Sequence, residues 1–185
     1  MSVSEITRTA MLRGRGWRKR LGEIAESMFL AKASTLGFGV AKPWGDSERY
    51  DFILDSGARL WRVQLKSAYR PTEYGGYNVS ACGNSRQAYS KHDLDVLVAY
   101  VVPVNGWYVV PLQAFARSTR MKFFPESRRR MSNFERFRER WCWMACRKSS
   151  AEHLLVSVPH GCQPESPRQS GSAPCPLSDL TSAQL

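Results

Sequence analysis

Residues 50–66 read YDFILDSGARLWRVQLK, and this stretch decides the fold. An apolar run at 50–54 and a longer one at 60–66 flank turn-forming residues at 55–58. Short apolar runs bounded by Asp, Ser and Gly are typical of β-strands joined by a tight turn. The stretch therefore predicts a β-hairpin.

The second strand of this hairpin ends in Gln64, Leu65 and Lys66. Side chains alternate between the two faces of a strand, so Gln64 and Lys66 share a face and Leu65 points into the core. In the simplest hairpin register, Asp51 lies beside Gln64 and Lys66. A carboxylate, an amide and an ammonium then meet at one sheet edge, an arrangement able to hold a metal ion together with a phosphodiester.

The rest of the chain alternates between helical and strand patterns. Apolar spacing predicts a first helix over 17–36, which Gly37 ends. A capping signal at Ser132 predicts a last helix through about residue 146. The other expected elements are a short helix at 111–117 and strands at 38–41, 77–82, 95–102 and 107–110. This order predicts an α/β fold in which helices flank a central mixed β-sheet.

The two ends of the 185-residue chain differ in composition from its middle. We expect residues 1–16 to form a basic, flexible arm and 17–147 to form one folded domain. Ser, Pro, Gly and Gln dominate the last part of the chain, so we interpret residues 148–185 as a disordered tail.

No part of the sequence predicts a membrane protein or a secreted one. No stretch approaches the roughly 20 apolar residues of a membrane span, and the first twenty residues contain no apolar signal region. The five cysteines follow no disulfide framework. This cysteine usage favours a reduced, cytoplasmic protein.

The chain is strongly basic, with a formal net charge of +11. Residues 147–185 hold three bases and three acids, so the whole excess belongs to residues 1–146. Basic clusters lie at 13–20 and 128–130. A field of this sign attracts polyanions through phosphate contacts and counterion release, which favours a nucleic acid as the partner.

Several segments resemble a known family of enzymes. They are LGEIAE at 21–26, VAKPWGDSERYD at 40–51 and VQLKS at 63–67. Their order is similar to that of the PD-(D/E)XK nuclease superfamily, and within it to the group I intron homing endonuclease branch, in which Gln replaces the acid of the third motif. WYVVP at 107–111 and FERFRERW at 134–141 also resemble that branch. The resemblance covers about residues 17–145 and implies a restriction-endonuclease-like core.

The resemblance also implies roles for individual residues. Asp51 would be the main metal ligand, joined by the carbonyl oxygen of Leu65, the amide of Gln64 and the carboxylate of Glu26. Lys66 would orient the attacking water or stabilise charge in the transition state. Such a set suits Mg²⁺, with Mn²⁺ as a substitute, because Mg²⁺ takes oxygen ligands and keeps several waters. The candidate catalytic residues are thus Glu26, Asp51, Gln64 and Lys66.

Two acids of the first helix compete for one role. Glu26 matches the second acid of a Gly-x-x-x-Glu pattern that begins at Gly22, whereas Glu23 lies on a neighbouring face. We favour Glu26. Near the second motif, Asp46 suits a turn cap better than a metal ligand.

Basic and hydroxyl-bearing residues around the predicted site are candidates for contact with the DNA backbone. About half of the loop tyrosines in this region should pack into the protein instead. The candidates are Arg18, Lys19, Arg20, Ser67, Tyr69 and Lys91.

Together these features predict a Mg²⁺-dependent endonuclease acting on double-stranded DNA. One candidate site per chain and two strands to cut favour a homodimer or homotetramer. Two alternatives stay open: a Holliday-junction-resolving nuclease, and a non-catalytic DNA-binding module that retains the nuclease fold.

Overall fold

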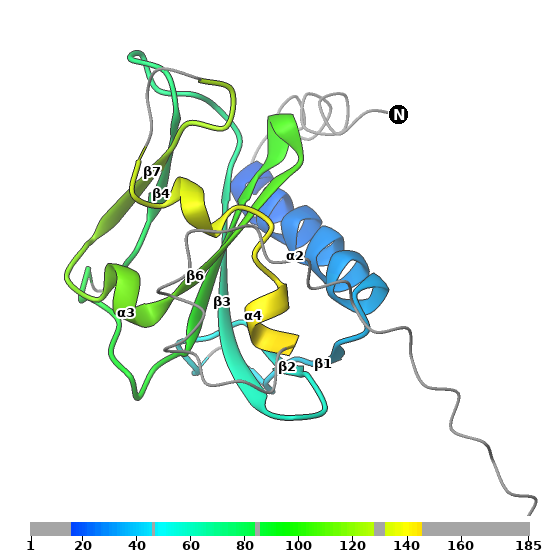
Figure 1. Ribbon diagram of the computed structural model, residues 1–185. Helices are drawn as coiled ribbons and strands as arrows, with labels where there is room; N and C mark the ends of the chain where they lie inside the picture. The colour runs from blue at the N-terminus through cyan, green and yellow to red at the C-terminus, as the bar shows by residue number, and fades with distance from the viewer. Residues whose placement is uncertain (1–15, 46, 84–85, 128–131, 146–185) are drawn as a thin grey trace, which may run out of the picture.

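The computed structural model describes residues 16–45, 47–83, 86–127 and 132–145. Its centre is a five-stranded sheet with the strand order β1-β2-β3-β5-β6, and a separate two-stranded sheet pairs β4 with β7 (Figure 1). The strands are β1 (Gly39–Ala41), β2 (Phe52–Asp55), β3 (Leu60–Ala68), β4 (Tyr77–Ser80), β5 (Val96–Val101), β6 (Gly106–Pro111) and β7 (Arg120–Phe123). This architecture confirms the predicted α/β fold with a mixed central sheet.

The first helix, α2 (Trp17–Thr35), forms where the apolar spacing predicted it. Its buried residues recur every four positions at Leu21, Ala25, Phe29 and Ala33, so one face of the helix packs on the sheet. Gly37 follows the helix with a φ of 83°, a left-handed conformation that glycine adopts at no steric cost.

The predicted hairpin is confirmed in its strands and its register. Strands β2 and β3 pair antiparallel, with Phe52 opposite Val63. On its other edge β3 runs parallel to β5, and β5 is buried along its whole length. The run at 95–102 therefore contains an interior strand, Val96–Val101, that is covered on both faces as its continuous apolar pattern predicted.

Two apolar layers lie on opposite faces of the sheet. One layer packs α2 against the sheet and includes Phe29, Phe52 and Leu65. The other packs β4, β7 and α3 (Leu112–Phe115) against the opposite face, so α2 and the small sheet lie on opposite sides of the large one (Figure 1). Leu65 is buried, as its position between Gln64 and Lys66 predicted.

The expected last helix over 132–146 is wrong. The structure forms a 3-10 turn, η2 (Glu135–Phe137), and a single helical turn, α4 (Cys142–Ala145), with an interruption between them. Arg138 forms a β-bridge with Tyr108, and Glu139 takes a φ of 51° while its N–H donates to the carbonyl of Trp107 at 2.8 Å. Pairing with the edge strand β6 therefore replaces helical hydrogen bonds at this point.

Two shorter segments also differ from expectation. Helix α3 ends at Phe115, so it is shorter than the predicted helix at 111–117. Strand β7 was not predicted. Among the described residues, no helix is long and apolar enough to span a bilayer. Residues 1–15 of the arm predicted at 1–16, the tail at 148–185 and Asp46 lie outside the described residues.

Candidate active site

Asp51 lies at the point where the pairing of β2 with β3 stops. Its N–H donates to the carbonyl of Val63 at 2.9 Å, which continues the hairpin by one residue. Its carboxylate turns toward β3, where Oδ2 accepts hydrogen bonds from the backbone N–H of Leu65 at 2.9 Å and from the side-chain amide of Gln64 at 2.5 Å. The predicted convergence of Asp51 and Gln64 is thus present.

Within the described part of the chain, Gln64 is the only buried residue with an amide or charged side chain, and 6% of its surface is exposed. A buried amide requires hydrogen-bond partners. Its Nε2 donates to Asp51 Oδ2 and lies 3.3 Å from the carbonyl oxygen of Leu65. The NH₂ group of the amide therefore contacts two oxygens at once, the carboxylate oxygen of Asp51 and the carbonyl oxygen of Leu65.

Burial raises the pKa of Asp51 above its ordinary value of 3.8, because a desolvated carboxylate favours its neutral form. The hydrogen bond from Leu65, the charge of Lys66 and the amide of Gln64 oppose this increase, while the charge of Glu26 adds to it. Lys66 and Glu26 are therefore close enough to act on Asp51 electrostatically.

Lys66 is half-buried on β3 and lies opposite Ala99 of β5. Alternation along the strand places it on the face of Gln64. Its attraction for Asp51 is the second-largest influence that keeps that carboxylate ionised, after the hydrogen bond from Leu65. The acid, the amide and the ammonium thus form one electrostatic group.

Glu26 is the half-buried acid of α2, and its Oε2 forms an ion pair with Lys42 Nζ at 2.5 Å. Glu23 is exposed and does not count among the main influences on Asp51. The position of these two acids supports the choice of Glu26 over Glu23. Neither side chain hydrogen-bonds to Asp51 among the described contacts.

Lys42 was missed in the sequence, although it lies in the quoted segment at 40–51. It follows β1 directly, and its ammonium lies 5.7 Å from the centre of the Phe52 ring. The hydrogen bond to Glu26 raises the pKa of Lys42, against the lowering effect of desolvation, and the charges of Glu26, Asp51 and Glu23 add to the increase. Lys42 is thus a second ammonium at the site.

Arg49, two residues before Asp51, was also missed. Its guanidinium forms an ion pair with Asp93 at 2.9 Å, donates to the carbonyl of Gln87 at 3.2 Å and lies 5.0 Å from the centre of the Tyr89 ring. These contacts fasten the segment before Asp51 to the loop between β4 and β5. The conformation of Asp51 therefore depends on a loop more than 30 residues away in the sequence.

The candidate DNA contacts fall into two groups. Arg18, Lys19 and Arg20 are exposed at the start of α2, and Lys91 is exposed in the loop before β5. Tyr69 instead donates its hydroxyl to the backbone carbonyl of Leu21, and burial raises its pKa to about 12. Tyr69 therefore joins the end of β3 to α2, as expected for part of the tyrosines, and the hydroxyl of half-buried Ser67 hydrogen-bonds to it.

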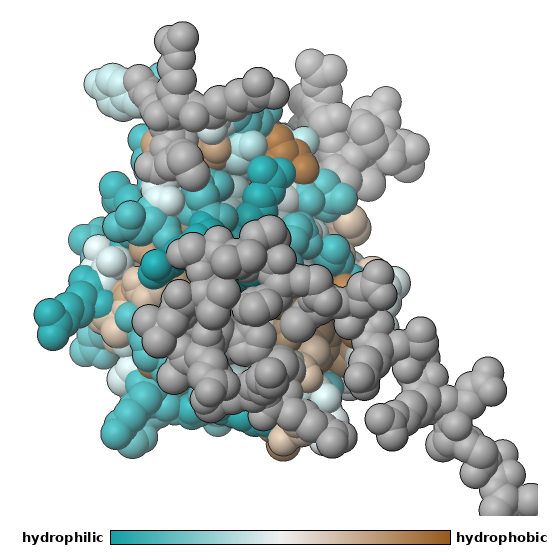
Figure 2. Space-filling view, in the orientation of Figure 1, coloured by the Kyte–Doolittle hydropathy of each residue, from teal (hydrophilic) through white to brown (hydrophobic). Residues whose placement is uncertain are grey.

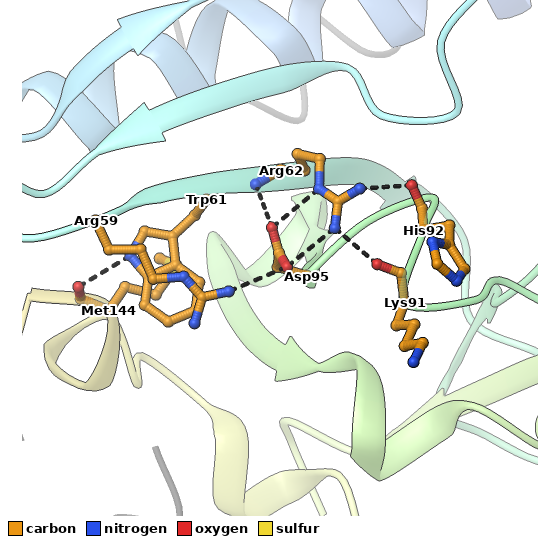
Figure 3. A network of polar contacts seen from close by, with 7 residues as sticks. All are labelled: Arg59, Trp61, Arg62, Lys91, His92, Asp95 and Met144. Carbon is orange, nitrogen blue, oxygen red and sulfur yellow. Dashed lines mark hydrogen bonds and ion pairs between the residues drawn. The ribbon is translucent and has the colours of Figure 1, made fainter. Parts of the chain in front are cut away.

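Figure 3 shows how the loop that carries Lys91 is held. The Arg62 guanidinium donates to the carbonyls of His92 at 2.5 Å and of Lys91 at 2.7 Å, and it pairs with Asp95 at 3.2 Å. Arg59 binds the same carboxylate at 3.1 Å. The backbone of Lys91 is therefore fixed while its side chain extends away from the network (Figure 3).

The chemistry of these donors suits a hard divalent cation. Carboxylate, backbone carbonyl and side-chain amide oxygens are the ligands that Mg²⁺ takes from proteins. The oxygens of Asp51 and Leu65 already meet at one hydrogen-bond donor, the Nε2 of Gln64. No cluster of three or more His, Cys, Asp or Glu side chains able to hold a metal occurs within the described ranges.

Comparison with known proteins agrees with this geometry. The family model for PD-(D/E)XK endonucleases matches residues 17–142. The solved structure of the bacterial homing endonuclease I-Ssp6803I is similar with a TM-score of 0.62 and 30% sequence identity, over 71% of this chain and 94% of that chain. No curated protein matched the sequence. The chain belongs to the PD-(D/E)XK endonuclease family, and its function is that of a nuclease.

Proposed function

We propose that this nuclease hydrolyses phosphodiester bonds of double-stranded DNA with Mg²⁺, in the manner of a homing endonuclease. The observation that carries the proposal is the contact of Asp51 Oδ2 with both the amide of Gln64 and the N–H of Leu65. It fixes the acid beside Lys66 and beside the carbonyl of Leu65. The similarity to I-Ssp6803I, a homing endonuclease, supports the DNA substrate.

Asp51 and the carbonyl of Leu65 would hold the ion, and the Gln64 amide, whose Nε2 faces these oxygens, would turn to present its oxygen. When bound, Mg²⁺ supplies charge for a phosphate oxygen and lowers the pKa of a bound water. Lys66 contributes a positive charge where negative charge develops on the phosphate. Glu26 would position a water, and its pairing with Lys42 limits the repulsion between Glu26 and Asp51.

A double-strand cut requires two sites, and the described part of one chain holds one candidate site. We therefore propose a homodimer or homotetramer that presents two copies to the two strands. Light scattering coupled to size exclusion would measure the mass directly. A strictly monomeric protein, alone and with DNA, would contradict this part of the proposal.

Incubation of supercoiled plasmid with the purified chain tests the activity. Nicked and then linear products are expected with Mg²⁺ or Mn²⁺ and none with EDTA. A matched preparation of Lys66→Ala excludes a contaminating nuclease, because only the intact site should cut. An unchanged plasmid in both metals, over a range of protein concentrations, would contradict the proposed function.

Two observations favour the non-catalytic alternative. The carboxylate of Glu26 is already paired with the ammonium of Lys42, and the third motif has the neutral Gln64 in place of an acid. A chain of this kind would shift DNA in a gel without Mg²⁺ and would cut no plasmid. A panel of linear and four-way branched duplexes distinguishes the junction-resolving alternative, which would cut the branched form preferentially.

A further inference from the structure

The small sheet of β4 and β7 forms a ribbon with one apolar and one polar face. Tyr77, Val79, Met121 and Phe123 are buried in the second core layer. The residues between them point the other way and pair across the ribbon, Asn78 with Lys122 and Ser80 with Arg120. Asn78, Ser80 and Arg120 are exposed, and Lys122 is half-buried. The fold thus presents a row of polar side chains on a rigid support.

The charge of this face is of one sign. Neither strand contains an acidic residue, whereas Arg120 and Lys122 are both basic. The side chains of Asn78 and Arg120 form no hydrogen bond or ion pair with any other residue in the described ranges. The side of the molecule where Figure 1 places β4 and β7 is mostly hydrophilic in Figure 2.

The start of β4 packs tightly against the residues that end and follow β7. Gly76 has a φ of 78°, and a Cβ there would lie 2.6 Å from the ring of Phe124. The ammonium of Lys122 in turn lies 5.1 Å from the centre of that ring, within reach of a cation–π contact. Lys122 is therefore held at one end of the polar face before any partner binds.

The other end of the ribbon leads to the candidate active site. The N–H of Ala81 donates to the carbonyl of Thr119 at 2.9 Å, one residue beyond the Ser80–Arg120 pair. Gly83 then passes so close to Arg49 that a Cβ there would lie 3.1 Å from Nη2. The ribbon is therefore joined, through Gly83 and Arg49, to the segment that carries Asp51.

We infer that the polar face of the β4–β7 ribbon enters the major groove of the DNA and reads its bases, an inference that rests on the proposed action on double-stranded DNA. The major groove admits a two-stranded ribbon. Strand residues and base pairs both repeat about every 3.4 Å, so four residues span about four base pairs. Asn78 suits an adenine edge, Arg120 a guanine edge, and Lys122 the phosphate backbone.

The test selects bound duplexes from a random-sequence library, in EDTA so that binding alone is measured. Wild-type protein should enrich a defined sequence. Asn78→Ala and Arg120→Ala should each lose preference at one position, by about 5- to 150-fold against the wrong base. Lys122→Ala should weaken binding to all sequences and reduce the slope of log affinity against log salt by about 1.

Arg117→Ala is the matched control, because it removes the same charge from an exposed position just outside β7. It should keep the wild-type preference. Identical preferences for Arg120→Ala, Asn78→Ala and wild type would overturn the inference, as would the absence of any preference in wild type. Altered oligomer mass without altered preference would identify the ribbon as a subunit contact and also overturn it.

Plasmid nicking separates this inference from the proposed function. Arg117→Ala should nick plasmid with Mg²⁺ as wild type does, because Arg117 lies outside both the ribbon and the candidate active site. If wild type shows a preference that Arg120→Ala loses but cuts no DNA, base reading by the ribbon stands and the nuclease proposal fails. If wild type cuts DNA and the variants retain its sequence preference, the nuclease proposal stands and base reading by the ribbon fails.

Discussion

Asp51 can be altered in two ways that separate its chemical role from its structural one. Asp51→Asn keeps the shape of the side chain, and its amide oxygen can still accept from the N–H of Leu65. The amide of Gln64 can rotate to present its oxygen to the new NH₂ group. Asp51→Ala removes both contacts, which in the wild type have lengths of 2.9 Å and 2.5 Å.

The expected sizes follow from these contacts. In Asp51→Ala the buried Leu65 N–H and the amide of Gln64 lose an acceptor, which costs roughly 1–3 kcal/mol for each unpaired group. We expect a total of about 2–6 kcal/mol and a decrease in melting temperature of about 5–20 °C. Asp51→Asn should remain within about 1 kcal/mol of wild type. Both variants should lose at least ~100-fold in nicking rate while they retain DNA binding.

The pH dependence of stability provides a third comparison. Burial raises the pKa of Asp51 in the folded state above 3.8, so the folded protein holds this proton more tightly than the unfolded chain. Its contribution to stability is therefore complete below the unfolded pKa and declines as pH rises through the folded pKa. In EDTA, the stability of wild type relative to Asp51→Asn should decrease between acidic and neutral pH.

Thermal unfolding, urea titration at several pH values and plasmid nicking measure these three effects on the same preparations. Equal destabilisation by Asn and Ala would show that the charge of Asp51, and not its hydrogen-bonding shape, supports the fold. Nicking by Asp51→Asn at the wild-type rate would refute the assignment of the active site. If the stability of wild type and of Asp51→Asn changed with pH in the same way, the raised pKa of Asp51 would not be the cause of the pH dependence.

Three other changes test neighbouring features. Lys66→Ala should lose at least ~100-fold in nicking rate with little change in gel-shift affinity, and a proportional loss of both would contradict a role in the chemical step. Lys42→Gln frees Glu26 from its ion pair, so half-maximal nicking should require less Mg²⁺. The change should be at most about fivefold, because Lys42 is exposed and solvent screens the pair. An unchanged or higher Mg²⁺ requirement would refute this competition. Gly76→Ala should lower the melting temperature more than Gly75→Ala, since both positions have φ above 70° but only Gly76 lies against Phe124; equal decreases in differential scanning fluorimetry would show that this packing is unimportant.

The features predicted from the sequence are those that local pattern determines. The hairpin at 50–66, its register and the position of Asp51 follow from alternation and from one turn. The helix before it follows from apolar residues at helical spacing and the glycine at its end. In each case nearby residues along the chain decide the outcome, so no distant contact is needed.

The features that were missed depend on contacts between distant parts of the chain. Strand β7 has only four residues, and its pairing partner β4 lies about 40 residues earlier. The last helix is interrupted because Arg138 pairs with Tyr108, which periodicity in the segment itself does not reveal. Arg49 and Lys42 could be recognised as basic residues near the second motif, but their carboxylate partners, Asp93 and Glu26, come from elements that only the folded chain brings close.

The geometry at Asp51 explains why structural and catalytic interpretations of this residue coincide. Regular pairing of β2 with β3 ends at Phe52 and Val63, so the next N–H of β3 that faces β2, that of Leu65, has no backbone acceptor there. The carboxylate of Asp51 supplies it. The same contact holds the charge next to the Leu65 carbonyl and Lys66, where a phosphate and a cation would meet. An acid that merely capped a strand would be replaced by asparagine without loss of function, so the Asn variant, rather than the Ala variant, decides between the two interpretations.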